Sequence, residues 1–216
     1  MNEVLILGDS YSTFLGHIPE GYAPHYGNPL TRTDVKKVEE TWWHMLTSER
    51  GETIAQNNSW SGSTICYTAY NNVDCSKINS FIFRLNELEK SGFFKEHDVK
   101  TLYIFGGTND NWANAPVGRV QYDNFTHKDL FSVLPATCYL VKRAKEIIPS
   151  SRIVVIINSE LKREITDGMK ECAMHYNVPF VELHDVDKTE GHPTKKGMTA
   201  IKDQIQQVLQ KIDDKN

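Results

Sequence analysis

Short apolar runs alternate along this chain with longer segments in which apolar residues recur at helical spacing. The runs have the length of buried strands and are rich in β-branched residues. They occupy residues 4–7, 53–56, 101–105, 153–157 and 179–181. Strands and helices that alternate in this way usually form a parallel sheet whose strands are joined by crossover helices. The pattern therefore predicts an α/β domain with a central five-stranded parallel sheet.

Four segments place their apolar residues on one face of a helix. Their apolar positions are Ile78, Phe81, Ile82, Leu85 and Leu88; Val133, Ala136, Leu140, Ala144 and Ile147; Ile165, Met169, Cys172 and Tyr176; and Met198, Ile201, Ile205, Val208 and Ile212. Residues 40–48 form a further amphipathic segment, in which we expect Trp42 and Trp43 to face the core. Because no linker rich in Pro, Gly or Ser divides the chain, we expect one domain over residues 1–216.

Two stretches between these elements are longer than the connections of compact domains usually are. They cover residues 13–38 and 111–129 and are rich in Gly, Pro, Asn, His and Tyr. Long connections of this kind are often binding loops. We therefore expect substrate choice to lie in these two stretches.

The charge balance and the apolar runs disfavour two kinds of partner. The 216 residues include 24 Lys and Arg against 28 Asp and Glu, so that no basic excess is available for nucleic acid or an anionic bilayer. None of the apolar runs approaches the roughly 20 residues of a membrane-spanning helix. We expect neither nucleic-acid binding nor membrane insertion. The N-terminal residues lack a secretory pattern, which predicts a cytoplasmic protein, or a secreted or periplasmic one whose leader has been removed.

The cysteines and histidines give no sign of a metal site or a cofactor. Cys66, Cys75, Cys138 and Cys172 contain no CxxC pair, and we expect reduced thiols, with a Cys66–Cys75 bridge as the alternative. The run of residues 184–187, His-Asp-Val-Asp, lacks further ligands at a recognisable spacing. The glycine-rich signatures of nucleotide-binding loops are also missing from the sequence. We therefore expect no metal and no cofactor.

Glycine and polar residues follow the first three predicted strands, at the sheet edge where open α/β folds bind ligands. One more short polar block precedes the last predicted helix. The four blocks are Gly8-Asp9-Ser10, Ser61-Gly62, Gly107-Thr108-Asn109-Asp110 and His192-Pro193.

These blocks contain the components of an acyl-transfer site. A serine hydroxyl needs a base to accept its proton, and the tetrahedral intermediate needs N–H donors aimed at its oxyanion. Ser10 can supply the nucleophile and one backbone N–H, Gly62 a second backbone N–H, and Asn109 a side-chain amide. His192 can act as the base.

In their order and spacing, the four blocks resemble those of the SGNH, or GDSL-type, hydrolase family. The resemblance extends from Gly8 to about Gly197. It implies a flavodoxin-like three-layer α/β/α sandwich and a serine esterase or deacylase. It also implies that Ser10 is the nucleophile, that Ser10, Gly62 and Asn109 form the oxyanion hole, and that His192 is the base.

The sequence departs from this family at the acid that orients the histidine. The family usually places an aspartate three residues before the histidine, and Thr189 stands there. Glu190 is our first candidate, because residues i and i+2 of an extended segment face the same side and would bring its carboxylate to the His192 ring. Asp187 is a second candidate. The third is a Ser–His dyad in which a backbone carbonyl holds the ring.

Aromatic residues adjoin the blocks and suggest the kind of substrate. Trp60 and Trp112 lie on loops beside two blocks, where an exposed ring can stack on a sugar or form the wall of an acyl pocket. The other aromatic residues expected along the cleft are Tyr11, His17, Tyr22, His25, Tyr26, Tyr67 and Tyr70. We expect a serine esterase for small oxygen esters, namely acetyl or another short acyl group on a carbohydrate or similar polar alcohol. A thioesterase or lysophospholipase of the same family, and a non-catalytic binding domain with the same fold, are the alternatives.

Overall fold

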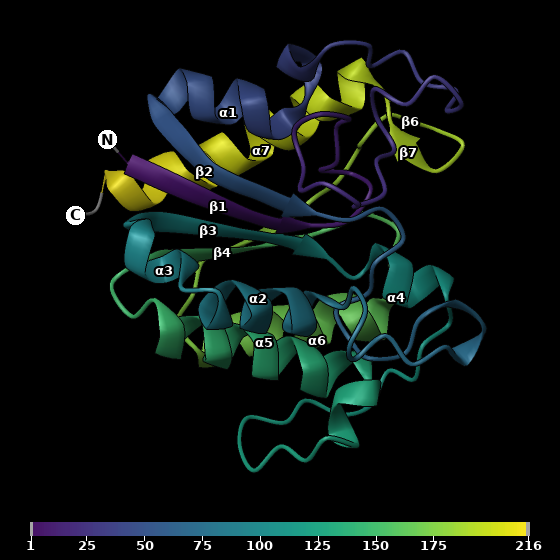
Figure 1. The fold of residues 1–216 in the computed structure, drawn as a ribbon, viewed down its shortest axis with the longest axis vertical. Helices are drawn as coiled ribbons and strands as arrows, with labels where there is room; N and C mark the ends of the chain where they lie inside the picture. Colours follow the sequence, from purple (N-terminus) through teal and green to yellow (C-terminus); the bar gives the residue numbers. More distant parts are fainter. Residues whose placement is uncertain (1, 215–216) are drawn as a thin grey trace.

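The computed structural model describes residues 2–214 and contains a five-stranded sheet between two layers of helices (Figure 1). The strands are β1 (Asn2–Gly8), β2 (Glu52–Ser59), β3 (Val99–Gly106), β4 (Arg152–Ile157) and β5 (Phe180–Glu182). They are hydrogen-bonded in the order β2-β1-β3-β4-β5, and every neighbouring pair is parallel. This is the strand order of flavodoxin-like folds. The predicted three-layer α/β/α sandwich with a central five-stranded parallel sheet is confirmed.

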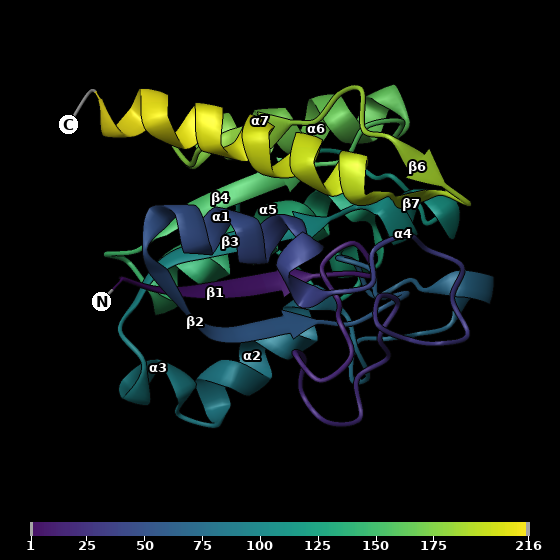
Figure 2. The ribbon, with the colours of Figure 1, turned by 90° about the horizontal axis from the view of Figure 1, so that it is seen from above.

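The long helices divide between the two faces of the sheet. Helices α1 (Trp42–Arg50) and α7 (Lys195–Asp213) cover one face, and Figure 2 shows them from above. The helices on the other face are α2 (Phe81–Lys90), α5 (Val133–Ile147) and α6 (Arg163–His175). No helix within residues 2–214 combines the length and the apolar character that crossing a bilayer requires.

Several short elements lie outside the periodic pattern. They are the helices α3 (Phe93–Glu96) and α4 (Thr108–Trp112), the 3-10 turns η1 (Val38–Glu40), η2 (Tyr70–Asn72) and η3 (Asp129–Phe131), and an antiparallel hairpin of β6 (Lys188–Thr189) and β7 (His192–Pro193). Segments this short carry too few residues to show a hydrophobic period, so the sequence does not predict them.

Alternate residues of β1 pack into two separate cores, one on each face of the sheet. Val4 and Ile6 pack with the residues of α1 and α7, whereas Leu5 and Leu7 pack with those of α2, α5 and α6. All four side chains are fully buried. Burial on both faces is the reason that the strands of a parallel sheet read as continuous apolar runs.

The helix boundaries follow local capping. Thr41 caps α1, and the two residues after it, Trp42 and Trp43, are buried in the core as predicted. Ser80 caps α2 by accepting a hydrogen bond from the Phe83 backbone N–H, so the helix begins one residue after the cap. Ile78 therefore lies outside α2 and is 51% exposed. The prediction that it belongs to the apolar face of that helix is wrong.

The first long connection lies at the carboxyl ends of the strands (Figure 1). Residues 13–37 contain no helix and no strand of the described structure beyond a single bridge between Phe14 and Tyr26. The second predicted stretch, residues 111–129, begins inside α4 and ends at η3. The first stretch therefore lies at the edge where the four sequence blocks meet. The second starts there, but its residues 122–125 contact Tyr139 and Lys142 of α5 and His175 of α6.

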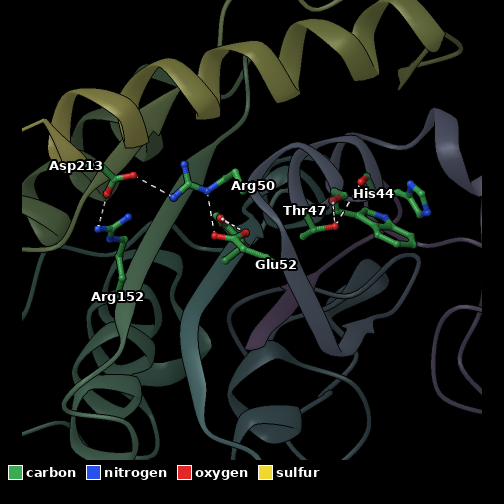
Figure 3. A network of polar contacts seen from close by, with 8 residues as sticks. His44, Thr47, Arg50, Glu52, Arg152 and Asp213 are labelled. Carbon is green, nitrogen blue, oxygen red and sulfur yellow. Dashed lines mark hydrogen bonds and ion pairs between the residues drawn. The ribbon is translucent and has the colours of Figure 1, made fainter. Parts of the chain in front are cut away.

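An ionic network closes the opposite edge of the sheet, at the amino ends of the strands (Figure 3). Arg50 bonds to Glu52 at 2.9 Å and to Asp213 at 3.0 Å. Asp213 also pairs with Arg152 at 2.7 Å. These contacts join the end of α7 to the end of α1 and to the starts of β2 and β4.

All four cysteines are buried, and their thiols are free. The Cys75 thiol donates a hydrogen bond to the carbonyl of Cys66 at 3.4 Å. Burial raises the pKa of both thiols. Cys66 and Cys75 therefore act as packing residues inside the segment that connects β2 to α2.

Candidate active site

Ser10 lies in a tight turn directly after β1. The Asp9 carboxylate accepts a hydrogen bond from the backbone N–H of Tyr11 at 3.0 Å, and the Asp9 carbonyl accepts one from Ser12 at 3.0 Å. A Cβ atom at Gly8 would come within 2.7 Å of Ser12 and Ser59, so only glycine fits there. The turn leaves Ser10 only 2% exposed and fixed in place. Asp9 therefore stabilises this turn through contacts with its backbone.

The structure brings Ser10 and His192 together across 182 residues of sequence. The Oγ of Ser10 lies 3.0 Å from Nε2 of His192. This is the separation required of a nucleophile and the base that accepts its proton. The pairing depends on the last hairpin, because His192 is the first residue of β7.

That hairpin corrects the prediction for Glu190. The residues that join β6 to β7 are Glu190 and Gly191, with φ angles of 50° and 78°. Two positive φ angles define a type I′ turn, so the segment is not extended as expected. The turn places the main-chain carbonyl of Glu190 3.2 Å from Nδ1 of His192, in the place expected for a carboxylate. Of the three arrangements considered for this ring, the geometry matches the backbone-carbonyl one.

Asp187 does not reach the histidine either. Its carboxylate accepts a hydrogen bond from the hydroxyl of Thr194, and its carbonyl accepts one from the Thr194 backbone N–H at 3.0 Å. The Thr194 hydroxyl in turn accepts from the backbone N–H of Gly197 and caps α7. Asp187 therefore closes the base of the hairpin against the start of the last helix.

The carbonyl at Nδ1 determines the tautomer of His192. A carbonyl can only accept, so Nδ1 carries the hydrogen and Nε2 presents its lone pair to Ser10. Burial lowers the pKa of His192, and the nearby charge of Lys188 also lowers it, against the opposing effect of Glu190. A neutral imidazole at neutral pH is the form that a general base needs.

Two buried tyrosines hold the hairpin in position. The Tyr11 hydroxyl donates to the carbonyl of Gly191 at 2.5 Å, and the Tyr26 hydroxyl donates to the carbonyl of Pro193 at 2.8 Å. Both side chains are fully buried, so the prediction that they line the substrate cleft is wrong. They instead fix the backbone on either side of His192.

The three predicted oxyanion donors, at Ser10, Gly62 and Asn109, differ in how they are held. Within residues 2–214, the backbone N–H groups of Ser10 and Gly62 have no hydrogen-bond acceptor. Gly62 has a φ angle of 82°, which favours glycine. The Asn109 amide donates one hydrogen to the carbonyl of Ser63 at 3.0 Å and accepts a hydrogen bond from the Tyr70 hydroxyl at 2.8 Å. These two bonds fix the amide plane and leave its second hydrogen free.

Arg84 is not among the predicted site residues, yet its side chain contacts both the first sequence block and the residues that flank the second. This α2 residue is 1% exposed, and its guanidinium donates to the carbonyls of Gly8, Asn58 and Asn79 and to the hydroxyl of Ser63. Burial lowers its pKa to about 10, so it keeps its charge at neutral pH. An arginine at a position otherwise belonging to the apolar face of α2 was the signal in the sequence.

Asp110 supports the loop that carries Gly62. Its two carboxylate oxygens accept hydrogen bonds from the backbone N–H groups of Ile65 and Cys66, at 2.9 and 3.0 Å. Burial raises the pKa of this fully buried carboxyl. Asp110 thus connects the third sequence block to the second.

The remaining aromatic residues fall into two groups. Trp112 lies beside His192, with ring centroids 5.6 Å apart, and is 44% exposed. The ring of Trp60, in the loop before Gly62, is tilted by 33° against the ring of Tyr22, with centroids 4.2 Å apart. His17 instead lines a hollow beside β2, and Tyr67 packs into the core. The expectation that His17 and Tyr67 line the cleft is therefore wrong, because their loops fold toward the sheet edge and the interior.

The GDSL-like lipase/acylhydrolase family matches residues 2–209, nearly the whole chain. The chain therefore belongs to this family of ester hydrolases, and the resemblance drawn from the four sequence blocks is confirmed.

Two crystal structures of Bacteroides proteins, each assigned as a GDSL-like lipase, are similar to the chain over nearly their full length. The B. uniformis ATCC 8492 protein is 45% identical with a TM-score of 0.90, covering 97% of this chain and 96% of that one. The B. ovatus ATCC 8483 protein is 39% identical with a TM-score of 0.90, covering 98% and 99%. A family two carbohydrate esterase from Clostridium thermocellum shares the fold at 13% identity and a TM-score of 0.64, covering 98% of this chain and 64% of that one. No curated protein matches the chain.

Proposed function

We propose that the protein is a serine esterase that works through an acyl-enzyme on Ser10. The observation that carries this proposal is the 3.0 Å contact between the Ser10 hydroxyl and Nε2 of His192. In the first step Oγ attacks the ester carbonyl carbon while its proton passes to Nε2. The same proton then goes to the departing alcohol oxygen as the bond between carbon and that oxygen breaks.

The second half of the reaction uses the same two residues. His192 takes a proton from water, the hydroxide oxygen attacks the acyl carbon, and the Ser10 oxygen leaves with the proton returned from Nε2. The backbone N–H groups of Ser10 and Gly62 and the Asn109 amide would stabilise the oxyanion of both tetrahedral intermediates. Their free hydrogens support this assignment.

The imidazolium that forms in each step is held without a carboxylate. The hydrogen bond from Nδ1 to the carbonyl of Glu190 becomes charge-assisted when His192 is protonated, and such bonds are stronger than neutral ones. In this Ser–His dyad the carbonyl of Glu190 orients the histidine, although Thr189 stands at the usual aspartate position.

We infer that the substrate is a short-acyl ester, such as an acetyl ester, of a carbohydrate or similar polar alcohol. A cavity of about 250 Å³ adjoins His192 and is lined by Arg32, Thr33, Asp34 and Thr189, with Pro193 and Thr194. Its volume is below the range of about 300–1,000 Å³ usual for drug-sized ligands, which favours a small group. Its hydroxyl and charged side chains suit a polyhydroxy alcohol better than a lipid chain.

Two other features bear on the substrate. The partly exposed Trp112 ring offers an apolar face beside His192 on which a sugar could stack. The carbohydrate esterase that shares the fold contributes only the fold to this proposal, because it is 13% identical. A wider groove of about 660 Å³ runs between α6 and the segment after β5, but neither Ser10 nor His192 lines it.

A panel of esters tests the proposal. Purified protein and Ser10→Ala are compared on p-nitrophenyl acetate, p-nitrophenyl octanoate, acetylated xylo-oligosaccharides, acetyl-CoA and a lysophospholipid. We expect Ser10-dependent turnover that is fastest on the acetyl oxygen esters. A preference for the thioester or the lysolipid would contradict the inferred substrate class and favour a thioesterase or lysophospholipase. Absence of turnover on all five esters would favour the binding domain.

A further inference from the structure

A second histidine lies face to face with the candidate base. The ring of His25 is centred 3.7 Å from the ring of His192, and the two planes differ by only 10°. His25 belongs to the long loop of residues 13–37, far from His192 in sequence. The contact is therefore made by the fold rather than by local sequence.

The backbone of His25 is tied down on both sides. Its N–H donates to the Thr13 hydroxyl at 2.8 Å, and its carbonyl accepts a hydrogen bond from the Thr31 hydroxyl at 2.6 Å. The neighbouring Tyr26 ring meets the His25 ring edge to face at 4.8 Å. These contacts fix the plane of His25 before any substrate binds.

His25 presents a ring face to the site, with no hydrogen bond from its ring. Within residues 2–214, neither ring nitrogen has a hydrogen-bond partner. Burial lowers the pKa of His25 to about 4, and the proximity of His192 acts in the same direction. At neutral pH the ring is uncharged, so it offers a π face and does not repel a positive neighbour.

The backbone of His192 is held by Tyr11 and Tyr26, but its ring has few restraints. Nδ1 has one neutral partner, the Glu190 carbonyl at 3.2 Å. Tyr11 and Trp112 meet the ring at tilted angles, with centroids 5.5 and 5.6 Å away. Among these contacts, the parallel one with His25 most directly restricts rotation of the imidazole plane.

We propose that His25 is a positioning residue for His192. Its stacked face keeps Nε2 of His192 directed at the Ser10 hydroxyl and stabilises the imidazolium that forms when Ser10 is deprotonated. The proposal rests on the Ser10–His192 esterase proposed above. His25 thereby supplies part of the orientation that a carboxylate gives the histidine in the usual triad.

The charges around His192 are few, which makes its titration a usable readout. The titratable groups that face it are Ser10, His25 and Tyr11, and the nearby charges are those of Lys188 and Glu190. Removing the His25 ring takes away the π face that stabilises the imidazolium of His192. The pKa of His192, which burial already holds below its ordinary value, should then fall further.

Three variants separate stacking from other roles of His25. His25→Ala removes the ring, His25→Phe keeps a neutral aromatic face, and His25→Leu keeps bulk without a π system. His175→Ala is the matched control. The His175 ring also stacks on an aromatic ring, that of Tyr122, with centroids 3.6 Å apart and planes that differ by 9°, but this pair lies away from the candidate site. Each variant is measured for kcat, KM and the pH dependence of kcat/KM on p-nitrophenyl acetate, with thermal melting as the folding check.

We expect His25→Ala to lower kcat about 3- to 30-fold with little change in KM, the range of a cation–π contact from exposed to desolvated. Its acid limb should move to lower pH. His25→Phe should keep kcat within about threefold of wild type, and His175→Ala should match wild type. If His25→Ala does not fold, His25→Leu takes its place and should show the same loss of kcat.

Two results would overturn the inference while leaving the esterase intact. One is His25→Ala, or its Leu substitute, with wild-type kcat and an unmoved acid limb. The other is His25→Phe as impaired as His25→Ala, since a ring nitrogen and not the stacked face would then be responsible. A wild-type protein without Ser10-dependent turnover would overturn the esterase itself, and this inference with it.

Discussion

Replacing Glu190 with Gln distinguishes the carbonyl that the structure places at His192 from the carboxylate that the sequence suggests. The substitution removes the charge and keeps the main-chain carbonyl that lies 3.2 Å from Nδ1. If a carboxylate oriented the ring, its loss would lower kcat by up to about 10⁴-fold, as in other serine hydrolases. Because the carboxylate of Glu190 is exposed and makes no hydrogen bond to the ring, we expect a far smaller effect.

The size of that smaller effect follows from the exposed position of the charge. Exposed charge pairs contribute about 0.2–1 kcal/mol, which corresponds to at most about fivefold in kcat. The Glu190 charge raises the pKa of His192, so its removal should move the acid limb of the pH profile down by less than about one pH unit. Steady-state kinetics on p-nitrophenyl acetate from pH 5 to 9 measure both quantities.

A second substitution at the same position provides the control. Asn-Gly is a favoured pair for type I′ turns, so Glu190→Asn should retain activity and melt no lower than wild type. A loss above about 10³-fold in Glu190→Gln, with Glu190→Asn correctly folded, would refute the carbonyl assignment and restore the carboxylate as the orienting group.

Three further predictions concern the surroundings of the site. Tyr70→Phe removes the hydroxyl that fixes the Asn109 amide and should lower kcat about 3- to 10-fold without raising KM, which steady-state kinetics will measure. Arg84→Met leaves buried carbonyls unpaired and should lower the free energy of unfolding in urea by about 3–5 kcal/mol. Burial raises the pKa of Asp9 to about 7, so native Asp9 keeps a proton that the unfolded chain loses near pH 4. Wild-type stability should fall relative to Asp9→Asn as pH rises from about 4 to 7, by up to about 1.4 kcal/mol per pH unit in urea titrations.

Each of these predictions has an outcome that would contradict it. Full kcat in Tyr70→Phe would mean that the amide of Asn109 is held by its bond to Ser63 alone. An unchanged urea midpoint in Arg84→Met would show that water reaches the freed carbonyls. Parallel stability curves for wild type and Asp9→Asn between pH 4 and 7 would place the native pKa of Asp9 near its ordinary value.

Much of the fold follows from patterns that repeat over several residues. Strands β1, β3 and β4 contain continuous apolar runs because both faces of the sheet are buried there, and the long helices carry a clear apolar face. The blocks that carry Ser10, Gly62, Asn109 and His192 could be found because parallel strands bring their carboxyl ends to one edge. Their roles in catalysis remain predictions that the kinetics above will test.

The details that the sequence did not predict depend on contacts between distant segments. A positive φ angle is uncommon for glutamate, so the residue type of Glu190 does not predict it. Because of this angle the main-chain carbonyl of Glu190, and not its carboxylate, meets His192. Tyr11 and Tyr26 are aromatic residues close in sequence to Ser10, which suggested the cleft. Their hydroxyls instead donate to backbone carbonyls of a hairpin more than 160 residues away in sequence. The stacking of His25 on His192 has no local signal at all.

Labelling with a fluorophosphonate tests most directly whether Ser10 is an activated nucleophile. Wild-type protein, Ser10→Ala and His192→Ala are each treated with the probe, and the modified residue is located by mass spectrometry of peptides. We expect one label per chain, on Ser10, in the wild type, and no label in either variant. A label on any other residue, or equal labelling of Ser10 in His192→Ala, would contradict the proposed Ser10–His192 dyad.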